Sequence, residues 1–249
     1  MSNTLLSVEG IIGAGKTFFN GLISKHTSIP VINEPICDWT AVNKSGQTYD
    51  VLEAFYDDPA TYAYDLQMVI LKSLAKQRKN VNHGCIERSM KSNRMFSFLQ
   101  HQKGNISDTQ YQKYMCKFEE VSKQLPKVTA RIYIKTSVDT AMKRIQQRAR
   151  PGEDHITRDY LKLLEACHEC WLMEAPNVFV VDGELDLTDE NNVKHVMYQL
   201  NLFFKKNASN GALGTNPRAL GTNPRALGTN PRALGTNPRA LGTNPRTRS

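Results

Sequence analysis

The chain has 249 residues, of which 40% are hydrophobic and 22% charged, with a formal net charge of +8. This composition suits one sizeable folded domain with an appendage, and no apolar stretch approaches the ~18–20 residues that a membrane span needs. Six arginines and no acidic residue lie in residues 207–249, so +6 of the charge belongs to that segment. The remaining +2 does not predict a core that binds nucleic acid, although the basic tail could contact polyanions weakly.

The first expected element is a strand over Thr4–Val8, followed by the sequence G-I-I-G-A-G-K-T from Gly10 to Thr17 and a helix over Lys16–His26. A strand, a glycine-rich loop and a helix in this order are typical of a loop that wraps around a polyphosphate with its backbone N–H groups. The sequence therefore predicts a nucleoside triphosphate site. Its expected residues are Gly10, Gly13, Ala14, Gly15, Lys16 for phosphate charge and Thr17 for Mg²⁺.

Strands and helices are then expected to alternate along the chain. Further apolar, β-branched runs predict strands over Ile29–Asn33, Asn80–Ile86, Arg131–Lys135 and Asn177–Val181. Helical patterns cover Pro59–Arg78, Ser92–Leu125 with a break near Lys103–Asn105, Val138–Arg148, Arg158–Met173 and Glu190–Lys205. Such alternation predicts an α/β fold, a parallel five-stranded sheet flanked by helices, with ligands beyond the carboxyl ends of the strands.

Charged side chains follow two of these strands. Glu34 comes directly after the second strand, and Glu87 and Arg88 come directly after the third. Phosphoryl transfer needs a metal ligand, cations for the phosphates and a group that takes the proton of the attacking hydroxyl. Glu87 fits the metal role, Arg88 the phosphate role and Glu34 the general base.

A third group of charges predicts an arginine-rich lid. Arg144 and Arg148 share a helix face, and Arg150 enters a loop that Pro151 and Gly152 would make bendable. Gathering three guanidiniums despite their mutual repulsion favours a lid that closes on phosphates.

The C-terminal segment has a different character. The heptapeptide A-L-G-T-N-P-R occurs five times in tandem between Ala212 and Arg246. A proline in every repeat opposes a helix, and one leucine per repeat buries too little surface to offset chain entropy. We expect residues 1–206 to form the folded domain and residues 207–249 to be a disordered tail. Five cysteines without a signal peptide favour a reducing, cytoplasmic location, which would be the host cytoplasm for a viral protein.

Taken together, the phosphate loop, Asn33-Glu34-Pro35, Gln67, Glu87-Arg88-Ser89 and the lid from Arg144 to Glu153 resemble the deoxyribonucleoside kinases in order and spacing. The resemblance covers about residues 4–205. It implies a P-loop kinase that transfers the γ-phosphate of ATP to the 5′-hydroxyl of a deoxyribonucleoside in nucleotide salvage for DNA synthesis, with Mg²⁺ as cofactor. The family is typically dimeric, so a homodimer is also expected.

The resemblance further implies roles for individual residues. Glu34 would remove the proton of the 5′-hydroxyl, while Thr17 and Glu87 would hold Mg²⁺. Tyr56 and Glu153 would grip the 3′-hydroxyl, and Trp39 would wall the base. The arginines Arg88, Arg148 and Arg150 would contact the phosphates, and Asp182 would lie near the adenine of ATP.

Two positions depart from the family pattern. Ile11 stands where the family commonly has Asn, which is expected to alter the packing of the loop. The aromatic residue usually found ten positions after Glu87 is replaced by Ser97, which lies between Phe96 and Phe98. Either a one-residue shift of the helix restores the stacking ring, or the pocket is wider.

The choice of nucleoside depends on the base-reading residues. The amide of Gln67 can pair with thymine, or, flipped, with cytosine. The deoxycytidine-selective pattern of the family adds an Arg and an Asp where this chain has Leu74 and Asn93. Apolar Ile70 and Leu74 suit the methyl group of thymine, so thymidine is favoured and deoxycytidine is the second candidate.

Two alternatives stay open from the sequence. A nucleoside monophosphate kinase such as thymidylate kinase shares the loop and the sheet, but needs a cation site for the phosphate of its acceptor. A nucleotide-dependent nucleic-acid-binding protein would use the basic tail, and would leave the acid, base and lid residues without a role.

Overall fold

The protein is described by a computed structural model that covers residues 4–40, 42–44 and 47–209. Its centre is strand β1 (Leu5–Glu9), in which all five residues are buried. Such complete burial is typical of a parallel sheet covered on both faces, where strands read as apolar runs rather than alternating patterns. The strand ends directly at the phosphate loop, so the buried sheet fixes where that loop begins.

The sheet has five parallel strands in the order β2-β5-β1-β6-β7. The other four strands are β2 (Val31–Ile32), β5 (Gly84–Glu87), β6 (Ala130–Lys135) and β7 (Val178–Asp182). Val8 is paired with Glu87 on β5 and with Ile132 on β6. This register brings the loop after β1 and the charged turn after β5 to the same edge of the sheet.

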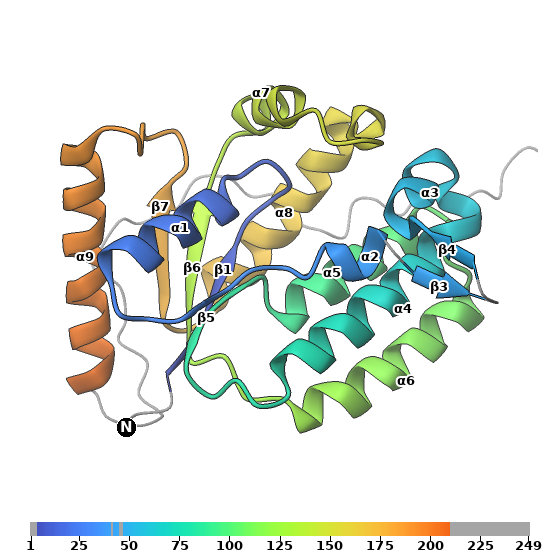
Figure 1. Cartoon of the computed structure of the whole chain (residues 1–249), viewed down its shortest axis with the longest axis horizontal. Coiled ribbons are helices and arrows are strands. Elements are labelled where there is room, and N and C mark those ends of the chain that lie inside the picture. The colour runs from blue at the N-terminus through green and yellow to red at the C-terminus, as the bar shows by residue number, and fades with distance from the viewer. Residues whose placement is uncertain (1–3, 41, 45–46, 210–249) are drawn as a thin grey trace, which may run out of the picture. The chain divides into compact units, whose positions relative to one another are not determined.

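Helices cover both faces of the sheet (Figure 1). α1 lies in front of the strands in this view and α8 behind them, with α9 beside α1. Phe19 and Ile23 of α1 and Leu161 and Leu164 of α8 are fully buried in the same apolar core as the strands. The bounds are α1 Lys16–His26, α7 Val138–Arg148, α8 Arg158–Glu174 and α9 Glu190–Ser209.

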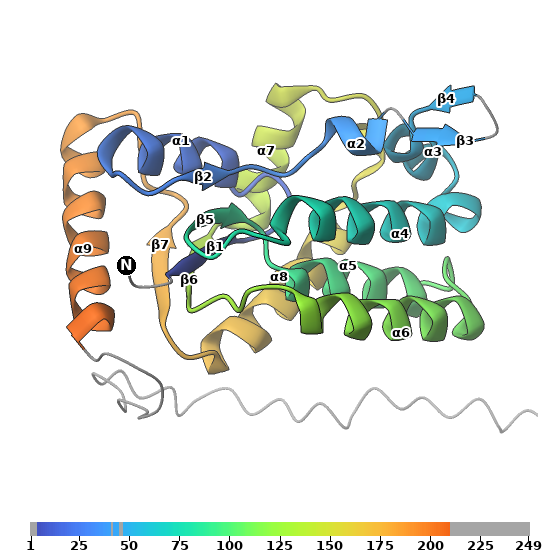
Figure 2. The ribbon, with the colours of Figure 1, turned by 60° about the horizontal axis from the view of Figure 1, so that its bottom comes forward.

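Beyond the β5 side of the sheet, three long helices pack side by side: α4 (Pro59–Arg78), α5 (Met90–Gln102) and α6 (Asp108–Gln124) (Figure 2). Their starts follow local rules. Asp58 caps α4 ahead of a proline at the first helical position, and Ser107 forms a capping box with Gln110 at α6. The expected break between α5 and α6 is confirmed, with Gly104 at φ 79° in the turn.

Two predicted strands are shorter in the structure. β2 keeps only Val31–Ile32 of the expected Ile29–Asn33 because Pro30 has no N–H for the sheet, although its carbonyl accepts from the N–H of Cys85 at 2.8 Å. β5 begins at Gly84 rather than Asn80, since the polar residues after α4 form a turn in which the N–H of Val81 donates to the carbonyl of Arg78.

A region between β2 and α4 was not predicted. It contains the short helix α2 (Cys37–Thr40), the antiparallel strands β3 (Val42–Lys44) and β4 (Gln47–Tyr49), and helix α3 (Val51–Asp57). A short 3-10 turn, η1 (Glu153–His155), follows α7.

No helix within the described ranges is long and apolar enough to cross a membrane. α9 extends to Ser209, and the repeat tail lies outside the described residues.

Candidate active site

The phosphate loop presents an open helix N-terminus. Gly15 caps α1 at φ 93° and, as a glycine, offers no side-chain acceptor to the first N–H groups of the helix. Gly13 is at φ 80°, and a Cβ there would lie 2.5 Å from the carbonyl oxygen of Ala141, so only glycine fits. Unpaired N–H groups and the positive end of the helix dipole together make this turn a site for an anion.

Lys16 lies inside the loop and is buried. Its Nζ donates to the carbonyl oxygens of Ile11 at 2.9 Å and Gly10 at 3.2 Å. Burial, followed by the positive charge of Arg88, lowers the pKa of Lys16 to about 7. The ammonium is therefore poorly solvated in the free protein, and a bound phosphate would supply the negative charge that it lacks.

We predict that ATP binding takes up a proton above pH 7. At pH 8 a group with a pKa of about 7 is mostly neutral, and the phosphates of ATP favour its charged form. Binding should therefore take up close to one proton, and the affinity for ATP should fall as the pH rises above 7. Calorimetry at pH 8 in buffers of different ionisation enthalpy measures this uptake. The Lys16→Met variant should show none, and equal heats for the wild type in all buffers would contradict the assignment.

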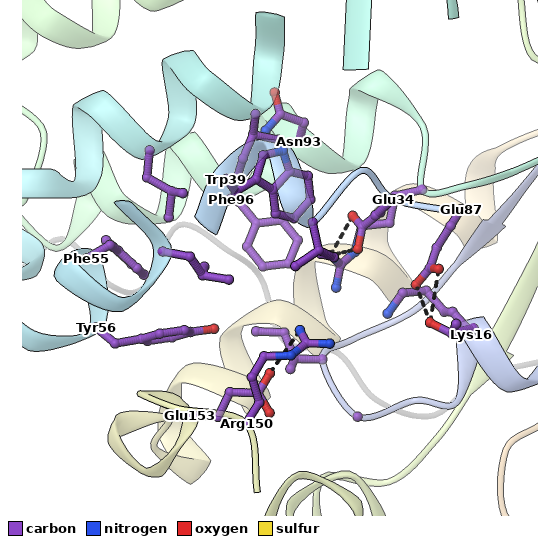
Figure 3. A pocket seen from close by; sticks show the side chains of 18 of the residues that line it. Lys16, Glu34, Trp39, Phe55, Tyr56, Glu87, Asn93, Phe96, Arg150 and Glu153 are labelled. Atoms are coloured by element: carbon purple, nitrogen blue, oxygen red, sulfur yellow. Dashed lines mark hydrogen bonds and ion pairs between the residues drawn. The ribbon is translucent and has the colours of Figure 1, made fainter. Parts of the chain in front are cut away.

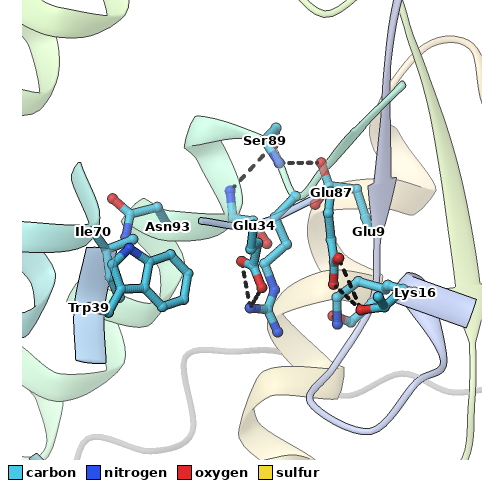
Figure 4. Close-up of polar contacts among 12 residues, drawn as sticks. Glu9, Lys16, Glu34, Trp39, Ile70, Glu87, Ser89 and Asn93 are labelled. Carbon is cyan, nitrogen blue, oxygen red and sulfur yellow. Dashed lines mark hydrogen bonds and ion pairs between the residues drawn. The ribbon is translucent and has the colours of Figure 1, made fainter. Parts of the chain in front are cut away.

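The turn after β5 holds its charged side chains in a constrained backbone. Arg88 is at φ 54°, in the left-handed region that is uncommon for residues with a side chain. On one side of it, the Oε1 of the buried Glu9 accepts from the N–H of Ser89 at 3.0 Å. On the other, Arg78 donates from Nη2 to the carbonyl oxygen of Glu87 at 2.8 Å. These two buried charges hold the turn from both sides, as Figure 4 shows for Glu9 and Ser89.

Glu87 reaches from this turn to the phosphate loop. The hydroxyl of Thr17 lies 3.1 Å and 3.0 Å from its two carboxylate oxygens. A hydroxyl and a carboxylate are the hard oxygen ligands that Mg²⁺ uses, usually one or two from the protein, with phosphates and water completing the shell. The described residues contain no group of three or more His, Cys, Asp or Glu that could hold a metal alone. This pair therefore fits a metal that arrives with a nucleotide.

Glu34 and Arg88 face each other across the site. The Nη1 of Arg88 donates to both oxygens of Glu34, at 2.9 Å and 3.1 Å. Burial alone lowers the pKa of Arg88, but the carboxylates of Glu34 and Glu87 outweigh burial and raise it. The pair is largely buried, and Figure 3 shows Glu34 on the same side of the cavity as Lys16 of the loop, an arrangement in which Glu34 can accept a proton.

One cavity of about 190 Å³ collects most of the predicted site residues. These are Gly13, Lys16, Thr17, Glu34, Trp39, Tyr56, Gln67, Ile70, Leu74, Glu87, Arg88, Asn93, Arg148, Arg150 and Glu153. Lys16, Glu34 and Glu87 lie toward the phosphate loop, whereas Trp39 and Phe55 lie away from it. The cavity therefore suits a molecule with an apolar ring at one end and a reactive group at the other.

At the apolar end, Trp39 is buried and its indole N–H donates to the hydroxyl of Ser73 at 2.7 Å. This bond fixes the ring as a wall. Ile70 and Leu74 line the same end together with the amides of Gln67 and Asn93. A ring bound here would meet apolar contacts on its faces and amide groups at one edge.

At the middle of the cavity, Tyr56 lies beside the lid. Burial, and then the charge of Glu153, raises the pKa of Tyr56 to about 12, so its phenol keeps its proton. Glu153 is buried and accepts from Arg148 at 2.7 Å and 3.0 Å and from Arg150 at 3.4 Å. Ala149 and Gly152, both at positive φ, turn the chain out of α7 so that these groups converge.

We predict that Gly152→Ala weakens nucleoside binding selectively. A Cβ at Gly152 would lie 2.7 Å from Cδ2 and 2.8 Å from Cβ of Tyr56, at φ +78°. The KM for the nucleoside should rise about tenfold, or about 1.4 kcal/mol, because the added Cβ would displace Tyr56 in the cavity, while the KM for ATP should change little. Gly104→Ala is the matched control, because Gly104 has φ +79° with nothing within 4 Å. Equal effects of the two substitutions would contradict a role for this contact.

The remaining predicted residues lie elsewhere. Arg144 donates to the carbonyl oxygens of Ala14 at 3.2 Å and Gly183 at 2.9 Å. It lines a second hollow with Ala14, Gly15 and residues 183–188, so Arg144 and Arg148 serve different hollows although both belong to α7. Asp182 does not line either hollow; its carboxylate accepts from the N–H of Glu184 at 2.9 Å. Gly10 lies behind the loop, where its carbonyl accepts from Lys16.

The structure also places the two residues that depart from the family pattern, Ser97 and Ile11. Phe96 lines the cavity and the guanidinium of Arg88 lies 4.8 Å from its ring centroid, whereas Ser97 is fully buried on another side of α5. Ile11 is buried in the core under the loop. Residues that the sequence reading missed include Glu9, Arg78, Leu52 and Phe55. The apolar spacing of Val51, Leu52 and Phe55 after the capping residue Asp50 was the signal for α3.

A parallel sheet with a phosphate loop, a carboxylate–arginine pair and an adjoining cavity is typical of a P-loop phosphotransferase. The comparisons with known proteins identify the class more closely. Residues 6–205 match the profile of the family described as deoxynucleoside kinase. The chain belongs to the deoxynucleoside kinase family, which favours a nucleoside over a nucleoside monophosphate as the acceptor.

Relatives in the family differ in their named substrates. A fowlpox virus (strain NVSL) protein named probable deoxycytidine kinase is 32% identical over 205 residues, covering 75% of this chain and 82% of the relative. The thymidine kinase of ictalurid herpesvirus 1 (strain Auburn) is 31% identical over 180 residues, covering 71% and 77%. The solved structure of the M. mycoides deoxyadenosine kinase with dCMP and dCDP has a TM-score of 0.66 at 25% identity, covering 80% of this chain and 99% of that one.

Proposed function

We propose that this kinase phosphorylates the 5′-hydroxyl of a pyrimidine deoxyribonucleoside with ATP, with thymidine as its preferred substrate and deoxycytidine as the second. The observation that carries this proposal is the Glu34–Arg88 pair, which lies between the phosphate loop and the apolar end of the cavity. A nucleoside with its base at the apolar end would bring its sugar hydroxyl to this pair.

In the proposed reaction, Glu34 takes the proton of the 5′-hydroxyl as the oxygen attacks the γ-phosphorus; the bond from that phosphorus to the β,γ-bridging oxygen breaks, and ADP leaves. Arg88 donates to Glu34 in the free site and steadies the attacking oxygen during the transfer. Lys16, Arg148 and Arg150 face the charge that develops on the phosphoryl oxygens. Thr17 and Glu87 hold Mg²⁺, which when bound neutralises phosphate charge.

Sugar recognition is assigned to Tyr56 and Glu153. Both border the middle of the cavity, and the charge of Glu153 acts on the phenol of Tyr56. We propose that they bind the 3′-hydroxyl, and that the ring of Tyr56 crowds the 2′ position and so excludes ribose. The second hollow beside Arg144 is assigned to the base of ATP, because it adjoins the backbone of Ala14 and Gly15.

Thymidine is preferred in this proposal because of the side chains around Gln67. Ile70 and Leu74 offer apolar contacts for a 5-methyl group, and neither can accept a hydrogen bond from a cytosine amino group. The relatives named for deoxycytidine and for thymidine are similar to this chain to nearly the same degree, so they do not favour either base. We also infer a homodimer from the family resemblance, which sedimentation of the purified protein would test.

The test is phosphorylation of thymidine, deoxycytidine, deoxyadenosine, deoxyguanosine and thymidine monophosphate, side by side, with ATP and Mg²⁺. The expected result is a 5′-monophosphate product with the highest kcat/KM for thymidine. A dominant deoxycytidine product would keep the mechanism and overturn the preference. Turnover of purine nucleosides alone would overturn the pyrimidine assignment.

A further inference from the structure

Three helices each contribute one polar side chain to a group at the apolar end of the cavity. Gln67 comes from α4, Asn93 from α5 and Tyr114 from α6, and these helices lie side by side (Figure 2). Gln67 and Asn93 line the cavity, whereas Tyr114 is fully buried behind them and does not. Tyr114 therefore has no direct access to a substrate.

The direction of the hydrogen bonds in this group is fixed at Tyr114. Burial raises the pKa of its phenol, so the oxygen carries a hydrogen that needs an acceptor. The structure gives it one, the Oδ1 of Asn93 at 2.8 Å. If Asn93 were turned the other way, its NH₂ group would face the phenol and the buried phenolic hydrogen would lose this acceptor.

Asn93 passes this direction on to Gln67. With Oδ1 turned to Tyr114, the Nδ2 of Asn93 faces Gln67 and donates to its Oε1 at 3.2 Å. A flipped Gln67 would place its own NH₂ against that of Asn93, so two donors would meet without an acceptor. The amide of Gln67 is therefore held in one orientation, with Nε2 free to donate.

The orientation of this amide has a chemical consequence for the base. Thymine presents a donor at N3 beside an acceptor at O4, and cytosine presents an acceptor at N3 beside a donor amino group. From one position, a glutamine needs opposite orientations to pair with the two bases. A glutamine that cannot flip must discriminate between them.

We propose that Tyr114 is a positioning residue for base selection: through Asn93 it fixes the amide of Gln67, and so makes the kinase strongly selective for one pyrimidine over the other. This rests on the proposed function, because it requires the base to meet Gln67. It goes beyond that function by naming a residue outside the cavity that controls the choice.

The test is the Tyr114→Phe variant, compared with the wild type for thymidine and deoxycytidine. We expect the ratio of the two kcat/KM values to move toward one by about tenfold or more, because the preferred substrate loses its fixed partner and the other gains access to a flipped amide. Tyr111→Phe is the matched control: Tyr111 lies on the same helix, its ring 6.4 Å from that of Tyr114, and its ratio should stay unchanged. General damage to the fold would lower kcat/KM for both substrates together and leave their ratio unchanged.

Two further measurements complete the test. Dissociation constants for both nucleosides, measured by calorimetry without ATP, should show the same change of ratio independently of turnover. Asn93→Ala should also move the ratio of kcat/KM values toward one, and it replaces Tyr114→Phe as the test if that variant does not fold. If both fold, the double variant should change the ratio little further. A folded Tyr114→Phe variant with an unchanged ratio overturns the proposal, as does a wild-type ratio near one. A wild type that binds neither pyrimidine overturns the proposed function as well, while unchanged selectivity in an active variant overturns this inference alone.

Discussion

Glu34→Gln will lower kcat by about 10²- to 10⁴-fold, the contribution typical of a general base. The amide keeps the size of the side chain and an oxygen that can accept from Arg88, which now bonds both carboxylate oxygens. It cannot take a proton from the attacking hydroxyl. Steady-state kinetics with the best substrate of the panel measures the loss.

Measuring the Kd for ATP should separate the loss of kcat in Glu34→Gln from general damage to the site. The hydrogen bonds of Lys16 in the phosphate loop go to the carbonyl oxygens of Gly10 and Ile11 rather than to Glu34, so the Kd for ATP should change little. Glu53→Gln is a suitable control because Glu53 is an exposed carboxylate on α3. Turnover of Glu34→Gln at the wild-type rate would show that another group takes the proton.

Glu87→Gln will lower kcat/KM by about 10²-fold or more, because a metal supplies several kcal/mol of charge stabilisation in phosphoryl transfer. The substitution keeps a hydrogen-bond partner for Thr17 but removes the charge that would bind Mg²⁺. The concentration of Mg²⁺ needed for half-maximal activity should rise accordingly. A titration of activity against Mg²⁺ after chelation measures both effects.

Glu87→Asp separates charge from reach. It retains the carboxylate on a shorter side chain. The Mg²⁺ concentration needed for half-maximal activity should therefore lie between the values for the wild type and for Glu87→Gln. If all three proteins required the same Mg²⁺ concentration, the metal would have to be bound by other groups.

The fold could be predicted from the sequence where a pattern is local. The helices Lys16–His26, Pro59–Arg78 and Val138–Arg148 have the predicted bounds because their caps and apolar spacing lie within or beside each segment. The site followed from the same logic, because residues after parallel strands meet at one edge of the sheet. Glu34, Glu87 and the loop needed no further information to be placed together.

What could not be predicted depends on contacts between distant segments. Glu9 bonds the backbone of Ser89, 80 residues away, and nothing near Glu9 in the sequence indicates this. The spacing rule pointed to Ser97 as the stacking position, but Ser97 is fully buried and the neighbouring Phe96 lines the cavity. The strands β3 and β4 are three residues each, too short for an alternating pattern to identify.

The ion pairs of Glu153 imply that ATP and the nucleoside affect each other's binding. In the free protein, this carboxylate is already held by Arg148 and Arg150. If nucleotide phosphates bind those guanidiniums as proposed, the carboxylate would be released to accept from a sugar hydroxyl. Each ligand then raises the affinity for the other by the same factor, as thermodynamic linkage requires. Under this proposal the donor and acceptor halves of the site would bind their ligands cooperatively, because both depend on the partners of Glu153.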